Sequence, residues 1–276
     1  MISEVKMRSL VMIFLTTTLL ISCASKNDVA VMKKADIHYT YGTEELFNKN
    51  YTQAITHLLK AVELDPENDK VHNNLAMAYY FKDEKEMAIK HINRALELNP
   101  KNTDAQVNLA SLHFEEGDLQ KAEKIYLQSL KDLTFEKHAR TYYNLGLIEV
   151  KRNNLAKGRV YLDKSLQQSE DFCPSWLQLG ILDLKTKKPK DAAKKFHQAR
   201  MGSCANDPAP LYWHAVSMME SKEYLNARMK FDELETRFPD SNYSRLAQQK
   251  LTEITLLENE TGPKNYSKTT LEDHNF

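Results

Sequence analysis

The chain repeats itself at intervals of about 34 residues, and this period restricts its fold more than any other feature. The segment AVELDP at residues 61–66 returns as ALELNP at residues 95–100. An alanine recurs at one point of successive intervals, and a leucine followed by a small residue recurs at another. The alanines are Ala54, Ala88, Ala122, Ala192 and Ala227, and the pairs are Leu75-Ala76, Leu109-Ala110, Leu145-Gly146 and Leu179-Gly180. A unit of this length cannot bury an apolar face alone, so we expect neighbouring units to stack on one another.

With Trp176 three residues before Leu179, the pattern resembles the tetratricopeptide repeat. The resemblance implies an all-α fold, a right-handed superhelix of about six helix-turn-helix repeats. Each repeat contains two antiparallel helices, A and B. Small residues at repeat positions 8, 20 and 27 let the helices approach closely, and large apolar residues at positions 4, 7, 11 and 24 fill the gaps. A proline at position 32 ends helix B.

Six repeats fit between residues 35 and 239 in this register. Their first residues are Ala35, Asp69, Thr103, Ala139, Cys173 and Pro208. The fourth repeat is degenerate, because Gly158 stands at position 20 and Ser165 at position 27. Both residues are still small, so we expect the packing geometry to survive there with weaker helix propensity.

The last repeat needs a cover for its open apolar face. A capping helix is predicted over residues 240–258, and its apolar residues Leu246, Leu251, Ile254 and Leu257 are expected to form that cover. Residues 259–276 are polar and lack apolar periodicity, so we expect a disordered tail.

The first two dozen residues carry the marks of export. Lys6 and Arg8 precede an apolar run over residues 10–21, which is too short to span a bilayer and is typical of a secretory signal. The ending Leu-Ile-Ser-Cys at residues 20–23 resembles the lipobox of bacterial lipoproteins. The resemblance implies cleavage after residue 22, acylation of Cys23 and a lipidated tether over residues 23–34. Inner-membrane lipoproteins commonly carry Asp after the lipidated cysteine, so Ala24 favours the periplasmic face of the outer membrane. The alternative to a lipobox is an ordinary signal peptide that ends near a cysteine.

Composition argues against several classes of function. The formal net charge is zero, which gives no electrostatic case for nucleic acid, and 7 glycines leave little room for phosphate-binding loops. No catalytic motif is present, and the nine histidines are scattered, with no three that converge as metal ligands. His57 and His91 share repeat position 23, on a helix face expected to be partly exposed. We therefore predict no enzyme activity, cofactor, metal or small-molecule substrate.

Cys173 and Cys204 remain as an even pair once Cys23 is assigned to the lipid. They take positions 1 and 32 of repeat five, at neighbouring ends of two antiparallel helices. In an oxidising compartment this placement predicts a disulfide, with two free thiols as the alternative.

A binding groove is expected along the A helices, which line the concave side of the superhelix. An apolar stripe beside a ladder of amides there suits a peptide or helix from a protein partner. The alternative is that several of these residues only pack between helices. The predicted groove residues are Asn73, Asn74, Met77, Tyr80, Val107, Asn108, Ser111, Phe114, Tyr143, Asn144, Leu147, Leu177, Gln178 and Ile181.

A lysine cluster surrounds Pro189 at a predicted helix turn. Its members are Lys185, Lys187, Lys188, Lys190, Lys194 and Lys195. A solvated turn is the simpler interpretation, and contact with anionic headgroups or an acidic partner is the other. No aromatic residues interleave with the lysines, which disfavours nucleic acid.

A lipobox followed by six such repeats and a late cysteine pair resembles the type IV pilus pilotin lipoproteins, the PilF, PilW and Tgl group. The resemblance implies a lipoprotein on the outer membrane that binds the pilus secretin and promotes its localisation and assembly. A general envelope scaffold, in cell-wall synthesis or outer-membrane protein assembly, is the second hypothesis. A regulatory subunit of an envelope enzyme is the third.

Overall fold

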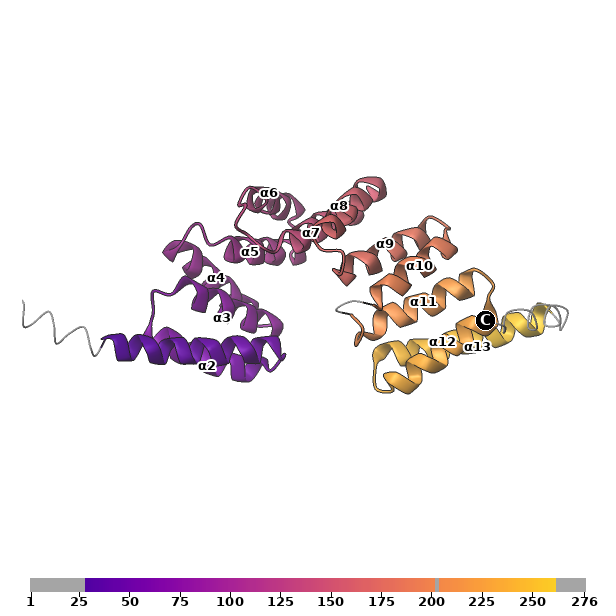
Figure 1. Ribbon diagram of the computed structural model, residues 1–276, viewed down its shortest axis with the longest axis horizontal. Coiled ribbons are helices and arrows are strands. Elements are labelled where there is room, and N and C mark those ends of the chain that lie inside the picture. Colours follow the sequence, from indigo (N-terminus) through magenta and orange to yellow (C-terminus); the bar gives the residue numbers. More distant parts are fainter. Residues whose placement is uncertain (1–27, 202–203, 262–276) are drawn as a thin grey trace, which may run out of the picture. The chain divides into compact units, whose positions relative to one another are not determined.

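The computed structural model describes residues 28–201 and 204–261. Within these ranges the chain forms helices and turns and no strand (Figure 1). The all-α fold predicted from the period is therefore confirmed. The predicted signal peptide over residues 1–22 and the predicted lipidation residue Cys23 lie outside the described residues.

The chain divides into two compact units, Met1–Phe135 and Glu136–Phe276. The described part of the first unit begins with a helix over residues 28–47. The other helices of this unit are α2 (Tyr51–Leu64), α3 (Asp69–Phe81), α4 (Lys85–Leu98), α5 (Thr103–Glu115) and α6 (Leu119–Ser129). The helices of the second unit are α7 (His138–Lys151), α8 (Leu155–Gln168), α9 (Cys173–Lys185), α10 (Pro189–Ala199), α11 (Pro208–Glu220), α12 (Tyr224–Arg237) and α13 (Asn242–Thr261).

The helices alternate as the A and B helices of successive repeats, and α3 packs on α4, α5 on α6, α7 on α8, α9 on α10 and α11 on α12. The A helices of repeats two, three, five and six begin at the residues that the sequence marks as repeat starts, and α7 begins one residue before Ala139. Helices α2 and α4 end two residues before Pro66 and Pro100, because the residue before a proline avoids the helical region.

Every turn between helices A and B holds one residue in the left-handed region, always at repeat position 15. Gly117 has a φ of 84° there, and Lys187 has a φ of 60°. The other four are Lys49, Asp83, Asn153 and Lys222, with φ between 63° and 64°. A side chain with a Cβ is disfavoured in this region, so the turns that lack glycine carry local strain.

Close approach of helices A and B depends on the residues at positions 8, 20 and 24. Ala88 and Ala192, both at position 20, are completely buried. At position 8, a Cβ added to Gly180 would lie 2.5 Å from the ring of Phe196 at position 24. Repeat two instead has Ala76 and Ile92 at these two positions, both buried. Repeat five thus packs an aromatic ring on a glycine where repeat two packs an isoleucine on an alanine.

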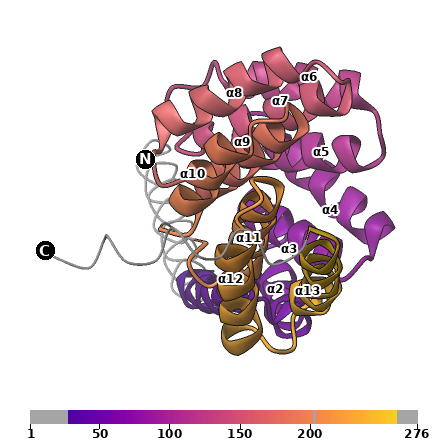
Figure 2. The ribbon, with the colours of Figure 1, turned by 90° about the vertical axis from the view of Figure 1, so that its right-hand side faces the viewer.

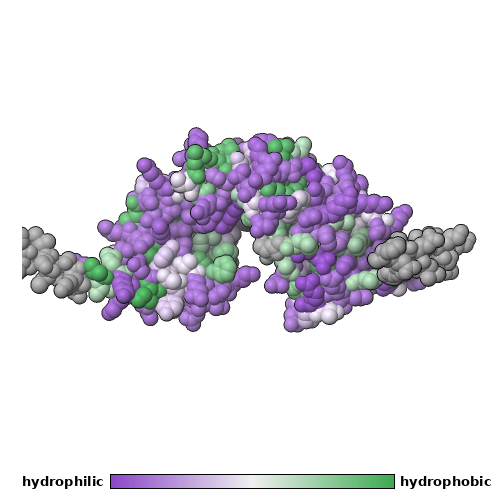
Figure 3. Space-filling model, in the orientation of Figure 1, coloured by the Kyte–Doolittle hydropathy of each residue, from purple (hydrophilic) through white to green (hydrophobic). Residues whose placement is uncertain are grey.

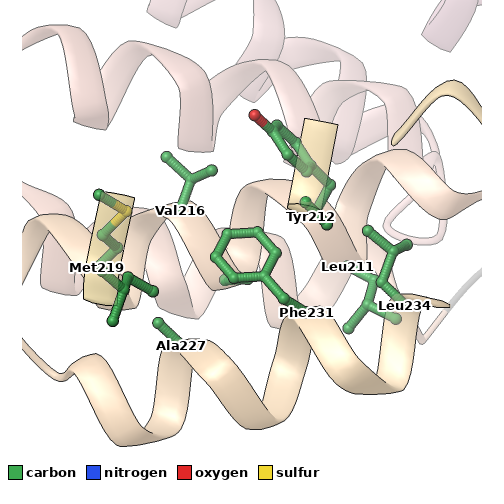
Figure 4. Packing of buried hydrophobic residues seen from close by; sticks show 10 residues of the cluster. Leu211, Tyr212, Val216, Met219, Ala227, Phe231 and Leu234 are labelled. Atoms are coloured by element: carbon green, nitrogen blue, oxygen red, sulfur yellow. The ribbon is translucent and has the colours of Figure 1, made fainter. Parts of the chain in front are cut away.

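The C-terminal helix covers the last repeat. Helix α13 packs against α11 and α12, and the three lie side by side (Figure 2). Beneath it, Phe231 points from α12 into a cluster with Leu211 and Tyr212 of α11 (Figure 4). Burying an aromatic ring of this kind contributes about 1.5–3 kcal/mol.

The prediction is wrong for one residue of this cover. Ile254 is completely buried, and Leu251 and Leu257 pack against the same cluster, but Leu246 is 40% exposed. Ala247 is buried in its place. At about 100° per residue, position 247 lies about 20° from the direction of Ile254 around the helix axis, whereas position 246 lies about 80° away.

Two predicted boundaries also need correction. The helix that ends at residue 47 already includes residues 28–34, which were predicted to belong to a tether. These residues contain Ala30 and Met32 and no glycine or proline, so nothing in them opposes helix formation. Helix α13 continues to Thr261, three residues into the predicted tail, before Gly262 and Pro263.

No helix among the described residues is long and apolar enough to cross a membrane. Hydrophilic residues dominate the surface of each unit in Figure 3, with smaller hydrophobic patches between them. The apolar side chains of the repeats are thus used mainly for packing between helices.

Candidate partner-binding surface and polar sites

The predicted groove residues lie on α3 and α5 of the first unit and on α7 and α9 of the second. Three of them, Asn73, Val107 and Asn108, are buried. The others are half-buried: Asn74, Met77, Tyr80, Ser111 and Phe114 in the first unit, and Tyr143, Asn144, Leu147, Leu177, Gln178 and Ile181 in the second. Within each unit the A helices bring these residues together, and most of them have some exposed surface.

The amide ladder of the first unit joins neighbouring helices. Asn108 on α5 donates from its side-chain amide to the side-chain oxygen of Asn73 on α3, 2.9 Å away. Asn73 in turn donates to Asn74 over 3.2 Å, and Asn74 donates to the hydroxyl of Thr43 over 2.9 Å. These amides thus form a chain of hydrogen bonds across three successive A helices, and their capacity to pair with a partner's backbone is partly used.

Two further groove residues make internal contacts. The Ser111 hydroxyl lies 2.9 Å from the hydroxyl of Tyr126 on α6. The Tyr143 ring meets Phe172 edge-on, with centroids 5.7 Å apart, and burial raises the pKa of the Tyr143 hydroxyl. Tyr143 is therefore mainly a packing residue, which weakens its assignment to a partner.

Four aromatic residues lie at helix ends in the first unit, and the sequence reasoning identified only Tyr80 among them. We call them the aromatic edge: Phe47, Tyr51, Tyr80 and Phe81. Phe47 is 87% exposed and Phe81 is 48% exposed. The Tyr51 ring stacks on Phe81 with centroids 5.0 Å apart, and Tyr80 meets Phe81 edge-on at 5.2 Å. Rings of this size exposed to water are typical of protein-binding sites.

The signal for the aromatic edge is present in the sequence. Phe47 and Phe81 both occupy repeat position 13, at the end of helix A. The later repeats carry charged residues at this position: Glu115, Lys151, Lys185 and Glu220. An apolar residue at position 13 is therefore a feature of the first two repeats alone.

In four repeats, the residues at positions 4 and 23 contact each other between helices A and B. His38 and His57 pair in repeat one, with ring centroids 5.6 Å apart, and His72 and His91 pair in repeat two. In the second unit Tyr142 pairs with Tyr161, and the Lys195 ammonium lies 4.9 Å from the ring centroid of Trp176. The sequence identifies position 23 as a shared histidine site but not its partner at position 4.

The pair of repeat two is buried, which corrects the partly exposed face expected for His91. The two Nδ1 atoms are 3.0 Å apart, and Nε2 of His72 lies 3.1 Å from the carbonyl oxygen of Pro66. Since that oxygen can only accept, Nε2 of His72 carries a proton, and in the neutral pair His91 donates through Nδ1. Burial lowers the pKa of His91 to about 4, and the charges of His72 and Lys90 add to the effect.

Two acidic residues are buried at repeat position 11, where an apolar residue is usual. Glu149 is 1% exposed and Asp183 is 3% exposed. Burial alone raises the pKa of Glu149, but hydrogen bonds from Lys157, Asn154 and Arg152 outweigh it and hold that pKa below its usual range. Asp183 pairs with Arg159 on α8 of the preceding repeat. Both acids are fully engaged in ion pairs and fit a structural role better than a catalytic one.

Cys173, at the start of α9, and Cys204, after α10, are joined by a disulfide with their Cα atoms 5.9 Å apart. The two ends of repeat five are thereby fixed to each other. Among the described residues, no three His, Cys, Asp or Glu side chains are placed to hold a metal ion.

The lysine cluster lies at the end of α9, on the turn that follows and on α10. Lys187 is the residue of this turn whose backbone lies in the left-handed region, and the Lys195 ammonium lies over the Trp176 ring. Lys185, Lys187, Lys188, Lys190 and Lys194 are exposed. The geometry matches a solvated turn and adds no second feature that points to an anion.

Models of the tetratricopeptide repeat match residues 48–83, 69–102, 86–141 and 211–241. The chain contains tetratricopeptide repeats. It is also homologous to the type IV pilus assembly protein PilF of Pseudomonas aeruginosa. The two are 25% identical over 202 residues, a match that covers 71% of this chain and 80% of PilF.

Solved structures share the fold of this chain. The structure of Pseudomonas aeruginosa PilF has a TM-score of 0.64 at 21% identity and covers 80% of this chain and 99% of its own. PilW, a widely conserved type IV pilus biogenesis factor, has a TM-score of 0.66 at 18% identity, with coverage of 78% and 98%. The Cut9–Hcn1 hetero-tetramer reaches 0.69 at 17% identity, but with only 43% of that chain covered. The fold alone thus does not distinguish a pilus protein from other repeat proteins.

Proposed function

We propose that this protein is an outer-membrane lipoprotein that binds a protein partner through its repeats and promotes the localisation and assembly of the type IV pilus secretin. The observation that carries the proposal is the homology to PilF, which extends over 80% of that protein's length. The PilF and PilW structures are also covered almost completely, whereas the Cut9–Hcn1 chain is covered by less than half. A match in both sequence and extent favours a shared role in pilus assembly.

The aromatic edge is the best-supported contact surface for the partner. Phe47 is 87% exposed, and its burial against a partner would remove more apolar area from water than any half-buried groove residue. Tyr80 belongs both to the aromatic edge and to the predicted groove, so the edge extends the groove toward the ends of the A helices. A hydrophobic segment of the partner that lies along α3 would contact both.

The lipid anchor rests on the Leu-Ile-Ser-Cys motif at residues 20–23. Acyl chains contribute about 0.8 kcal/mol for each CH2 group that enters the bilayer, so several chains on Cys23 hold a protein firmly on the membrane. We expect mass spectrometry of the mature N-terminus to find these chains and Cys23→Ser to block processing or release the protein. A mature, unacylated wild-type chain in the soluble fraction would remove the anchor from the proposal.

The decisive experiment measures the fraction of secretin in heat-stable multimers in a strain deleted for this protein. We expect the multimers to disappear with the deletion and to return with the wild-type gene. The variant Phe47→Ala/Phe81→Ala should stay folded and membrane-bound, yet restore few multimers. The matched control Leu225→Ala/Met229→Ala removes two apolar side chains of α12 that are 48% and 62% exposed, and it should restore them fully.

Three results would contradict the proposal at different levels. Normal multimers in the deleted strain would exclude the secretin role, and a general scaffold in the envelope would take its place. Multimers restored fully by the edge variant would place the binding site elsewhere on the repeats, and an equal loss with the edge variant and its control would show that the aromatic edge has no specific role.

A further inference from the structure

The helix over residues 28–47 presents an apolar stripe that is largely exposed, although the centroid of the Tyr41 ring lies 5.6 Å from that of the His57 ring on α2. Val29 is 68% exposed, Ile37 is 45% exposed and Tyr41 is 53% exposed. With Lys33 between the first two, these residues follow one another at intervals of four, so they lie in a slowly turning row along one side of the helix. We call Val29, Lys33, Ile37 and Tyr41 the outer stripe.

The opposite side of this helix is fixed in the fold. Ala35 is 2% exposed, and a Cβ added to Gly42 would lie 2.6 Å from the Leu58 side chain on α2. At about 100° per residue, Ile37 points about 160° away from Ala35 around the axis. The helix therefore cannot rotate to bury the outer stripe without breaking its packing on α2.

The proposed anchor lies close to the start of this helix. Five residue steps separate Cys23 from Asp28, and a fully extended chain spans at most about 3.6 Å per step, or about 18 Å in total. The first turn of the helix therefore stays within about 18 Å of the lipid attachment point, whatever conformation the intervening residues adopt. A helix held this close to a bilayer meets its headgroups readily.

We propose that the outer stripe lies in the interface of the lipid bilayer, with the helix axis along the membrane surface. The proposal rests on the lipidation of Cys23 in the proposed function. Tyr41 offers an amphipathic ring of the kind that concentrates at headgroup level, and Val29 and Ile37 offer apolar surface. Lys33 can lay its methylene stem on the apolar region and keep its ammonium among the phosphates.

The contact ends before the end of the helix. Glu44 follows Ile37 by seven residues and so lies about 20° from it around the axis, on the same side. It is exposed, and an acidic side chain opposes entry into the interface. Asp36 is also exposed, but it lies about 100° from Ile37 around the axis, at the edge of the stripe beside Val29. The contact is thus confined to residues 29–41, and Phe47, about one turn beyond Glu44, stays with the aromatic edge for the protein partner. The lipid would then set the direction in which the repeats leave the membrane.

The test places the photoreactive residue benzoylphenylalanine at position 37 of the full lipidated protein, and in a second variant at position 29. Each protein is reconstituted in vesicles of phosphatidylethanolamine and phosphatidylglycerol, and mass spectrometry identifies what the probe captures on irradiation. The matched control carries the probe at Asn93, an exposed residue of α4 in the same unit. We expect lipid adducts at 37 and 29 at least tenfold above those at 93.

The outcomes separate this inference from the proposed function. Lipid adducts at positions 37 and 29 support the inference. Adducts with a second copy of the chain, no adducts, or equal lipid adducts at position 93 overturn it, even if Cys23 is acylated and the secretin assembles. A chain whose Cys23 carries no acyl group overturns both the anchor and the inference.

Discussion

Asn108 on α5 donates a hydrogen bond of 2.9 Å to Asn73 on α3, and this amide pair joins the A helices of repeats two and three. Each of the two residues is 7% exposed. In a stacked array, stability depends on the interface between neighbouring repeats, so a polar bond at that interface acts on both sides of it. The same position was predicted to offer its amide to a partner, and the structure gives it a second use inside the fold.

We therefore predict that Asn108→Ala destabilises the first unit. The substitution leaves the Asn73 oxygen buried without this donor, at a cost of about 1–3 kcal/mol. Amide hydrogen exchange should speed up in α3 and α5 and stay unchanged in α11. The control Asn93→Ala removes an exposed amide from α4 and should leave both unchanged. Full protection in Asn108→Ala would mean that the pair adds nothing to the interface.

We predict that two substitutions in the turns between helices A and B change the stability of the protein in opposite directions. Gly117 and Lys187 occupy the same repeat position, with φ of 84° and 60°. A Cβ built on Gly117 meets nothing within 4 Å, so Gly117→Ala adds backbone strain without a clash and should cost about 1 kcal/mol. Lys187→Gly relieves such strain and should gain a few tenths of a kcal/mol to about 1 kcal/mol. Thermal melts of both variants check the pair, and a shift in the same direction for both would contradict it.

Gly180 and Phe196 should show strong coupling. Gly180→Ala places a Cβ against the Phe196 ring, and overpacking of this kind costs about 1–3 kcal/mol despite the better helix propensity of alanine. Adding Phe196→Ile recreates the Ala76 and Ile92 pair of repeat two and should recover part of the loss. A double-mutant cycle in denaturant measures the coupling, and purely additive effects would show that the two positions are independent.

Much of this fold could be predicted from the sequence because its packing rules recur. Asp69, Thr103, Cys173 and Pro208 begin helices as the register requires, since the small and large apolar residues can satisfy one another in only one alignment. The prediction that Leu246 covers the last repeat was wrong, because α13 belongs to no repeat and only its one apolar face sets its rotation. Its neighbour Ala247, a short residue, gave no comparable signal.

The candidate surface could be predicted less well, because the period does not determine exposure. A repeat determines which positions belong to an A helix. Asn73, Tyr143 and Phe47 all lie on A helices, yet their side chains differ widely in burial. Whether such a side chain meets a neighbour or water depends on the sizes of the residues in the adjoining repeats. The pairing of repeat positions 4 and 23 was missed for a similar reason, since it requires the angle between helices A and B.

The disulfide should stabilise repeat five. Cys173 and Cys204 are separated by 31 residues, and closing a loop of this length contributes about 3–4 kcal/mol in the chain-entropy model. We expect dithiothreitol to lower the melting temperature of the wild-type protein and to leave Cys173→Ser/Cys204→Ser unchanged. Two alkylatable thiols in protein isolated from the periplasm without reductant would show that the bond does not form in the cell.

The buried histidine pair predicts a loss of stability in mild acid. The pKa of His91 is about 4 in the folded protein, against about 6.5 in an unfolded chain. Between these values the unfolded chain binds more protons, so the contribution of His91 is complete above pH 6.5 and is lost as the pH falls toward 4. We expect the free energy of unfolding to fall by about 1–3 kcal/mol as the pH falls through this window.

His91→Gln keeps a hydrogen-bonding side chain that does not titrate, so it should reduce the pH dependence in the first unit; His72, whose pKa burial also lowers, accounts for the part that remains. Amide hydrogen exchange in α3 and α4 between pH 7 and pH 4.5 makes the measurement local. His214 on α11 serves as the internal control, because burial and the charges of Arg200 and Lys230 also lower its pKa to about 4. Exchange in α11 should therefore keep its acid sensitivity in the variant. If α3 and α4 lose protection in acid equally with and without His91, the pair does not govern the acid stability of the first unit.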